Sequence, residues 1–288
     1  MTHHLFLAWS CFGHGQLTEM GLAFAISQFM NLRKLFVLKR LRQFEKVQSA
    51  IETAALGSPG FPPTEKEVNK FLEEQEKRSP TDTAQSLVRL FSELPTWVQE
   101  EDIHRGNIPK IGESLEKDSQ VRHFMRSYRN TTAAEAYKKS REYIWDHLFW
   151  AWSGMRKGVY HQPRWYDFLN DSSLDDFDSG VKHLAKALHT IEDSYAPGHT
   201  GRASGTGIIK DIYYWPDTKN GDKSKGIPSH EELDNPGNGM SKEFYAMARQ
   251  ATGSFILCVL NNLDQDQNVF VKDCGGKLNT HLNAQLSS

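Results

Sequence analysis

The stretch HTIEDSYAPGH, residues 189–199, places two imidazoles and a carboxylate where one metal ion could reach all three. His189 and Asp193 are four residues apart, so on a helix their side chains project from the same face. The Pro-Gly pair that follows ends the helix, and His199 can then turn back toward the same ion or a neighbouring one. Imidazole and carboxylate ligands together favour zinc over calcium or magnesium. The alternative is a helix C-terminus that carries ordinary surface polar residues.

Apolar residues recur at helical spacing on both sides of this stretch, and strand patterns are weak apart from one short pair near 208–215. Two loop-rich stretches, 100–118 and 200–239, interrupt the helical pattern. We therefore expect an all-α fold, a single multi-helix domain. The expected helices cover about 17–55, 64–78, 81–94, 132–152, 180–195 and 241–263. The aromatic-rich segment 143–152 is expected to lie mainly in the core and only secondarily on a membrane face.

Composition excludes several classes of protein. A net charge of −2 provides no global field that would attract nucleic acid or an anionic membrane. No run of about 18 apolar residues occurs, so we expect no transmembrane segment. The three cysteines, Cys11, Cys258 and Cys274, are too few and too scattered for a disulfide framework or a thiolate zinc site. Any zinc must then be held by nitrogen and oxygen, from the 12 histidines and the many carboxylates.

The N-terminus is unusual because residues 1–8 (MTHHLFLA) carry only a short apolar run. This run is too short for a complete signal peptide, and it could be a signal remnant, a misplaced start or a cloning scar. We therefore divide the chain into an extension or signal remnant at 1–8 and one domain at 9–288.

Further His and Asp residues are candidates for the same metal centre. His230 and Asp234 repeat the His-x3-Asp spacing and could close a second site, although a solvent-exposed acidic turn is the alternative. His14 lies in a Gly-His-Gly sequence at the start of the first expected helix. His123 has hydrophobic neighbours, and Asp102 falls at an expected helix end. Each of these alone would be read as an ordinary core histidine or surface residue.

In their order along the chain, these residues resemble the zinc-dependent phospholipases C and the zinc-dependent single-strand nucleases that share their fold. The family's N-terminal Trp, closely followed by a His, is similar to Trp9-Ser-Cys-Phe-Gly-His14, especially at the nuclease spacing. The family's His-x3-Asp-x5-His motif is matched in full by residues 189–199. Its final His, followed four residues on by an acidic residue, is matched by His230 and Asp234.

A less specific part of the resemblance concerns Asp102 and His123. The family has an Asp at a helix end and then a His beside an aromatic residue, here His123-Phe124, although the gap is longer than usual. Asp118, five residues before His123, competes with Asp102 for this position.

The resemblance implies an all-α fold around a cluster of two or three zinc ions. The implied ligand sets are Asp102, His123, His189 and Asp193 for one ion, His199, His230 and Asp234 for a second, and Trp9, His14 and Asp193 for a third, with Asp193 bridging. Trp9 ligates in the family through its free α-amino group, which requires cleavage after Ala8. Asp102 is also the candidate that orients or deprotonates the attacking water.

The expected activity is zinc-dependent hydrolysis of the glycerol-phosphate ester bond of glycerophospholipids such as phosphatidylcholine. The Ser-Tyr-Ala-Pro-Gly interior of 189–199 looks like bacterial phospholipase C relatives, whereas the nuclease spacing near Trp9 keeps a single-strand nuclease as the alternative. Tyr213, Tyr214 and Trp215 could form an aromatic lip that touches a lipid interface or a choline ammonium, or could stack on a base. The resemblance also implies secretion and a phospholipid surface as partner, with no stable nucleic-acid partner. A non-catalytic helical zinc protein is the alternative from a different class.

Overall fold

The computed structural model describes residues 14–15, 17–22, 25, 93–98, 101, 120–160, 172–214, 239–263 and 265–286. This part of the chain is mostly helical with one small β-hairpin, which confirms the expected helical class while adding two strands. None of the described helices is both long and apolar enough to cross a bilayer.

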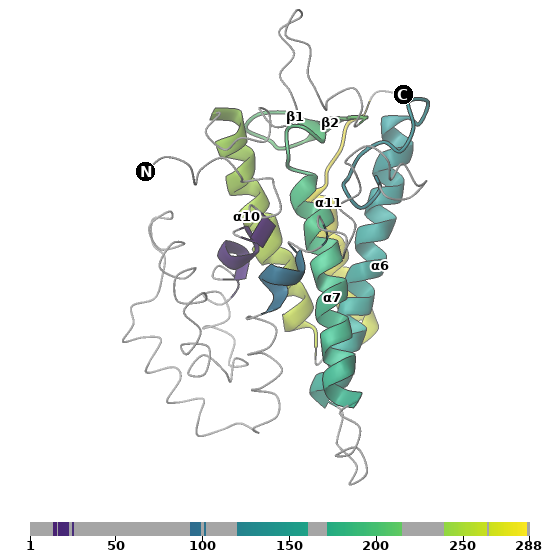
Figure 1. Cartoon of the computed structure of the whole chain (residues 1–288), viewed down its shortest axis with the longest axis vertical. Helices are drawn as coiled ribbons and strands as arrows, with labels where there is room; N and C mark the ends of the chain where they lie inside the picture. Colours follow the sequence, from purple (N-terminus) through teal and green to yellow (C-terminus); the bar gives the residue numbers. More distant parts are fainter. Residues whose placement is uncertain are drawn as a thin grey trace, which may run out of the picture.

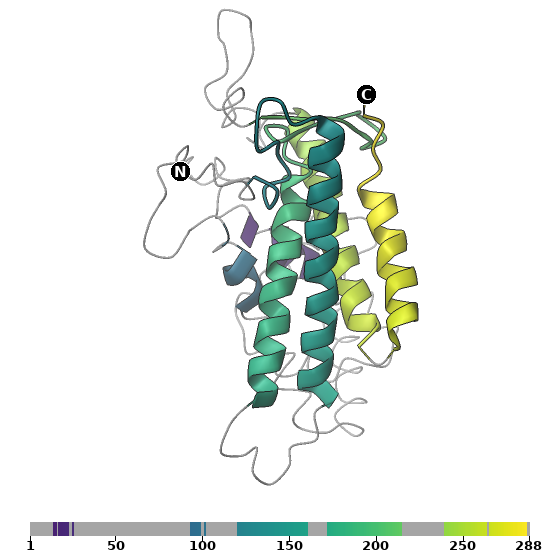
Figure 2. The same cartoon turned by 90° about the vertical axis from the view of Figure 1, so that its right-hand side faces the viewer.

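Four long helices run side by side along the long axis of the molecule (Figures 1 and 2). They are α6 (Ala133–Tyr160), α7 (Ser172–Asp193), α10 (Gly239–Asn261) and α11 (Gln267–His281). Helix α7 contacts both α6 and α10, and α10 in turn contacts α11. The described residues 14–15, 17–22 and 25, here called the N-terminal helical segment, pack into the same core as residues 93–98.

Local sequence explains where two of these helices begin. Thr132 and Glu135 form a capping box: the Glu135 carboxylate accepts from the Thr132 backbone N–H at 2.9 Å, and the Thr132 hydroxyl accepts from the Glu135 N–H at 3.1 Å. In α11, the side chain of Asp266 accepts from the backbone N–H groups of Asn268 and Val269. Both caps satisfy donors that a helix start otherwise leaves unpaired.

The expected helices at 132–152, 180–195 and 241–263 are confirmed, with α6 extending to Tyr160 and α7 beginning already at Ser172. Helix α11 was not expected, because Gly275 and Gly276 interrupt its sequence and only every fourth residue, such as Phe270 and Cys274, is buried. The expected helix at 64–78 lies outside the described residues. So do most residues of the expected helices at 17–55 and 81–94, and the few that are described there are helical.

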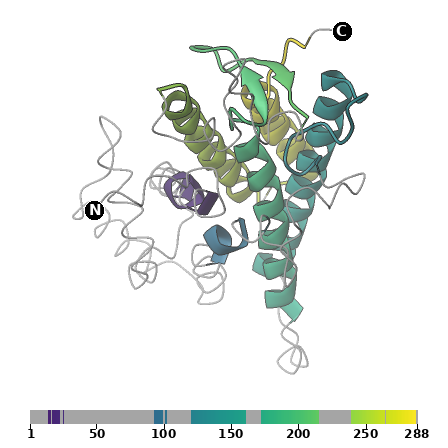
Figure 3. The same ribbon diagram turned by 45° about the horizontal axis from the view of Figure 1, so that its top comes forward.

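The hairpin pairs β1 (Thr200–Arg202) with β2 (Ile209–Ile212) in antiparallel register, with Thr200 opposite Ile212 (Figure 3). Strand β2 falls in the stretch expected to contain two strands, but its partner precedes it and begins directly after His199. Part of the expected loop at 200–239 is therefore regular structure that lies at the C-terminal end of α7.

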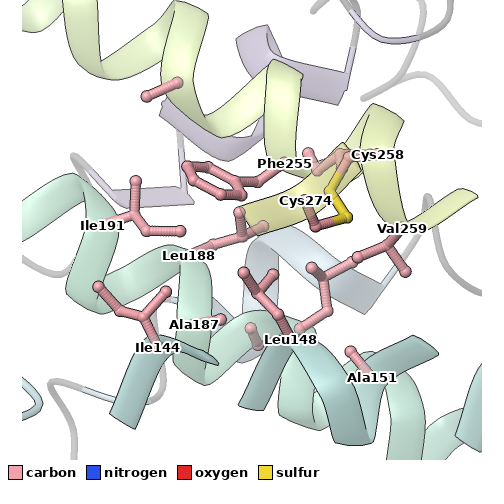
Figure 4. Close-up of a cluster of buried hydrophobic side chains, with 14 of the residues drawn as sticks. Ile144, Leu148, Ala151, Ala187, Leu188, Ile191, Phe255, Cys258, Val259 and Cys274 are labelled. Carbon is pink, nitrogen blue, oxygen red and sulfur yellow. A yellow bond between two sulfur atoms is a disulfide. The ribbon is translucent and has the colours of Figure 1, made fainter. Parts of the chain in front are cut away.

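Aliphatic and aromatic side chains from α6, α7 and α10 interlock in the core (Figure 4). The fully buried members labelled there include Ile144, Leu148, Leu188, Ile191 and Phe255. Burial of each such side chain stabilises the fold by about 1.5–3 kcal/mol relative to leaving it in water. This core holds α7 in place, and with it the metal-ligand motif at its end.

Cys258 of α10 and Cys274 of α11 form a disulfide inside this core (Figure 4). The sequence did not indicate the pairing, because α11 had not been expected and two cysteines 16 residues apart have no defined geometry without it. The cross-link closes the helical hairpin of α10 and α11.

The aromatic segment of α6 is mostly core, as expected. Trp145, Phe149 and Trp152 pack around Phe270 of α11, with the Trp152 ring stacked on it at 4.9 Å between centroids. Trp150 differs because its side chain remains 55% exposed beside His183 of α7, so the core assignment was wrong for this residue.

Glycines allow α6 and α7 to approach closely. A Cβ atom added to Gly180 would lie 2.5 Å from the backbone nitrogen of Met155, and one added to Gly154 would lie 2.9 Å from the Cα of Gly180. By contrast, a Cβ added to Gly275 of α11 would meet nothing within 4 Å.

We predict that Gly180→Ala destabilises the protein by about 1–3 kcal/mol, because the helices must separate to admit the methyl group. The matched control Gly275→Ala should stabilise it by up to about 1 kcal/mol, since alanine is the better helix former and the space is open. Urea unfolding followed by circular dichroism measures both. Equal effects of the two substitutions would show that the α6–α7 contact is not close-packed.

A histidine pair links the same two helices. The Nδ1 atoms of His147 and His183 lie 2.7 Å apart, with both rings part-buried. Burial, with smaller contributions from His183 and Lys186, lowers the pKa of His147 to about 4. An unfolded histidine has a pKa near 6.5, so between these values the unfolded chain binds more protons than the folded one. Stability contributed by neutral His147 is therefore lost as pH falls from about 6.5 towards 4.

We predict that His147→Gln makes stability less sensitive to acid over this range, because one buried histidine no longer takes up a proton on unfolding. The measurement compares urea midpoints at pH 7 and pH 5 for wild type and variant. His281, whose pKa burial also lowers to about 4, is present in both proteins and cancels in the comparison. An unchanged difference between the two pH values would contradict the prediction.

Candidate metal centre

Four imidazoles surround the carboxylate of Asp193, the last residue of α7, whose side chain is almost fully buried. Oδ1 lies 3.2 Å from Nε2 of His14 and 3.7 Å from Nδ1 of His199. Oδ2 lies 3.0 Å from Nδ1 of His123 and 3.1 Å from Nε2 of His189. Each carboxylate oxygen therefore faces two imidazoles, and all five residues were predicted as metal ligands.

Segments far apart in the sequence bring these side chains together. His189 and Asp193 share one face of α7, as their spacing predicted. His14 comes from the N-terminal helical segment, and His123 from a turn before α6 in which Phe124 has a positive φ of 53°. A buried phenylalanine rarely adopts this conformation, so packing around Phe124 holds the turn that presents His123.

His199 is held by the turn that follows α7. Its backbone N–H donates to the carbonyl of Ala196 at 2.9 Å, and its Nδ1 donates to the carbonyl of His123 at 2.6 Å. Because a carbonyl only accepts, this bond assigns the proton of neutral His199 to Nδ1.

Three of the ligand atoms form a nearly equilateral triangle. His123 Nδ1 and His189 Nε2 lie 3.1 Å apart, and each lies 3.0–3.1 Å from Oδ2 of Asp193. In a tetrahedral zinc site with bonds of about 2.0–2.1 Å, neighbouring ligand atoms are about 3.3–3.4 Å apart. The triangle therefore has close to the size of one face of a zinc coordination tetrahedron.

Glu192, which the sequence analysis did not single out, contacts the same cluster and is fully buried. Its Oε2 lies 2.8 Å from Nδ1 of His14, and its Oε1 accepts from the hydroxyls of Thr18 and Thr252, each at 3.0 Å. The signal that could have identified it is its place in the HTIED sequence, directly beside Asp193 in the last turns of α7, where residues 187–193 are all buried.

Electrostatics distinguish the two adjacent carboxylates. Burial raises the pKa of Glu192 above its usual value. The hydrogen bond from His14 is the largest effect that lowers it. Burial also disfavours the charged form of Asp193, but His199, His189 and His14 outweigh it and hold the pKa of Asp193 well below its usual range. Among the described residues, neither carboxylate forms an ion pair with lysine or arginine. A divalent cation would balance both charges.

The buried group of His14, His189 and Asp193 could hold a metal ion, since their ligand atoms all lie within 4.8 Å of one another. Among the residues that the structure describes, the available donors are imidazole nitrogens and carboxylate oxygens, because both described cysteines are joined in a disulfide. A buried group that could hold a metal ion therefore forms around the HTIED motif. The identity and number of ions remain predictions.

A buried arginine holds the turn between Asp193 and His199. The Arg202 guanidinium lies 3.8 Å from the centroid of the Tyr195 ring. It donates to the Ser194 carbonyl at 2.6 Å, to the Ser194 hydroxyl at 2.9 Å and to the Gly207 carbonyl. Burial lowers the pKa of Arg202 to about 10. The sequence analysis missed this residue, because its partners are mainly backbone carbonyls.

The remaining predicted site residues are only partly described. Six of them lie outside the described residues: Trp9, Asp102, its competitor Asp118, His230, Asp234 and Trp215. Tyr213 and Tyr214 are half-buried beside the centre: the Tyr213 N–H donates to the carbonyl of His199 at 2.8 Å, and its carbonyl accepts from the Arg126 N–H at 2.9 Å. Their backbone is therefore fixed next to His199, while their role in substrate binding stays a prediction.

No protein-family model, curated protein or solved structure matches this chain. The likeness to the zinc-dependent phospholipases C and nucleases thus rests on the motif residues alone.

We predict that His189→Ala and Asp193→Ala each prevent metal binding, because each removes a candidate ligand from the centre of the cluster. His183→Ala is the matched control on the same helix, since His183 pairs with His147 and not with Asp193. Inductively coupled plasma mass spectrometry of the dialysed proteins measures the metal content. Full metal content in either ligand variant, or loss of metal in His183→Ala, would show that the ligand set is wrong.

Proposed function

We propose that this protein is a zinc-dependent phosphodiester hydrolase of the phospholipase C type. It would cleave the glycerol-phosphate ester bond of glycerophospholipids such as phosphatidylcholine. The observation that carries the proposal is the position of Asp193, whose two oxygens each face a separate pair of imidazoles inside a buried cluster.

This arrangement suits a carboxylate that bridges two ions. Oδ2, with His123 and His189, would hold one zinc, and Oδ1, with His14, would hold a neighbouring one. His199 would contribute to a further ion. By resemblance to the family, Asp102 would join the first ion, His230 and Asp234 would join His199, and Trp9 would join His14, giving two or three zinc ions in all.

The donor chemistry supports zinc. Imidazole and carboxylate are ordinary zinc ligands, and the 3.0–3.1 Å triangle is close to the size of one face of a tetrahedral site. A structural zinc site is closed by four protein ligands, whereas a catalytic site keeps one position for water or substrate. The hydrolase proposal therefore requires two or three ions with an open position, rather than one closed site.

The chain's own residues would bind the phosphodiester, orient water and exclude bulk solvent. Bound zinc would supply a water of lowered pKa and neutralise charge on the phosphate oxygens. Asp102 is the candidate that orients this water for in-line attack on phosphorus. The new P–O bond replaces the bond to the glycerol oxygen, which takes up a proton. The products are diacylglycerol and the phosphorylated headgroup.

The substrate class is supported by the motif interior and by charge. The Ser-Tyr-Ala-Pro-Gly interior of residues 189–199 resembles phospholipase C relatives, and a net charge of −2 offers no general attraction for a polynucleotide. The spacing of Trp9 and His14 keeps the single-strand nuclease as the second candidate. A non-catalytic helical zinc protein would bind a single closed ion. We also propose an extracytoplasmic location, which the disulfide between Cys258 and Cys274 supports.

We predict that zinc-supplemented protein releases phosphocholine from mixed micelles of phosphatidylcholine in the presence of a short single-stranded oligonucleotide. Phosphorus NMR of this one reaction resolves the products of both substrates. Phosphocholine with unchanged oligonucleotide resonances is the expected result, and a chelator should stop its formation. Nucleotide monophosphates alone would assign the nuclease activity instead. The absence of both products in a sample shown to contain the bound ions would contradict the hydrolase proposal.

A further inference from the structure

The carboxylate of Glu192 connects three parts of the fold beside the metal centre. Glu192 lies on α7, Thr252 on α10, and both His14 and Thr18 on the N-terminal helical segment. His14 and Thr18 are four residues apart, so one helical face of this segment contacts both oxygens of the carboxylate. All four side chains are at least 99% buried.

This contact also determines how His14 faces the cluster. A carboxylate oxygen accepts, so the bond at 2.8 Å assigns a proton to Nδ1 of His14. Nε2 then faces Oδ1 of Asp193 at 3.2 Å. With neutral His14, two lone pairs confront each other, an arrangement that a cation between them would stabilise. Histidines that bind metals commonly donate their second ring N–H to a carboxylate in this way.

We propose that Glu192 is a positioning residue of the metal centre, which orients His14 for an ion shared with Asp193. The inference rests on the proposed metal centre and adds a residue that is not itself a ligand. It also links metal binding to the docking of the N-terminal helical segment, because Glu192 holds that segment through two side chains.

The first test compares the zinc affinity of wild type and Glu192→Gln by competition with a chromophoric chelator. Glutamine preserves the side-chain shape but removes the charge, and loss of such an outer partner typically weakens metal binding roughly 10- to 100-fold. Glu243→Gln is the matched control. Glu243 lies on α10 and also accepts two hydrogen bonds, from Ser204 and Gly205, but it is exposed. The control should retain wild-type affinity.

A double-mutant cycle tests whether Glu192 acts through His14. In a His14→Ala background, Glu192→Gln should cause little further loss of zinc affinity, because the ring that it orients is gone. An equally large loss in both backgrounds would overturn the positioning role.

Metal-free stability separates this role from ordinary structural support. Without metal, the oxygen of Glu192→Gln can still accept from the Thr18 and Thr252 hydroxyls, so the thermal midpoint should change little. If the Glu192 carboxylate served only to hold the helices together, its loss would make the variant less stable both with and without zinc. That outcome, combined with unchanged zinc affinity, would overturn the proposal.

Wild-type protein provides a readout that does not depend on the variant folding. In the zinc-bound protein, nitrogen-15 NMR should place the proton of His14 on Nδ1 and the metal on Nε2, and the opposite assignment would overturn the inference. Failure of the proposed metal centre is distinguishable, because wild type would then bind no zinc. Failure of this inference alone would leave wild type and Glu192→Gln with equal affinity.

Discussion

The structure depends on placing two consecutive carboxylates, Glu192 and Asp193, in a region closed to water. Burial of an unpaired charge costs several kcal/mol, so each oxygen must find a donor or a cation. Glu192 is satisfied by one imidazole and two hydroxyls, whereas Asp193 lies 3.0–3.7 Å from nitrogens of four imidazoles, a position that a bound cation would stabilise. One of these partners, His14, lies 178 residues before Glu192 in the sequence. The last turn of α7 is therefore where distant segments of the described fold contact one another.

The surrounding fold makes this convergence rigid. Close packing at Gly180 holds α7 against α6. Arg202 holds the turn after Asp193, because its guanidinium donates to the carbonyl of Ser194 in that turn and to the carbonyl of Gly207 in the loop of the hairpin. His199 then donates to the carbonyl of His123, so two predicted ligands also support each other. Ligands held in this way lose little conformational entropy when an ion binds.

The sequence predicted what depends on local spacing. His189 and Asp193 share a helical face because they are four residues apart, and this required no knowledge of the tertiary structure. Convergence of His14 and His123 on Asp193 followed only from the ordered resemblance, since nothing local brings residues so distant together. Helix α11, the cysteine pairing, and the roles of Glu192 and Arg202 were missed, because each depends on contacts between elements. Trp150 was wrongly predicted to be buried, because apolar residues surround it in the sequence and their pattern does not show which face of α6 is exposed.

The central claim is that the Asp193 cluster binds zinc through nitrogen and oxygen alone. X-ray absorption spectroscopy at the zinc edge of the loaded protein tests it most directly. The account predicts a first shell of nitrogen and oxygen at about 2.0–2.1 Å with the outer-shell pattern of imidazole, and no sulfur at about 2.3 Å. A sulfur shell, or an oxygen shell without imidazole, would place the zinc somewhere other than beside Asp193 and would contradict the account.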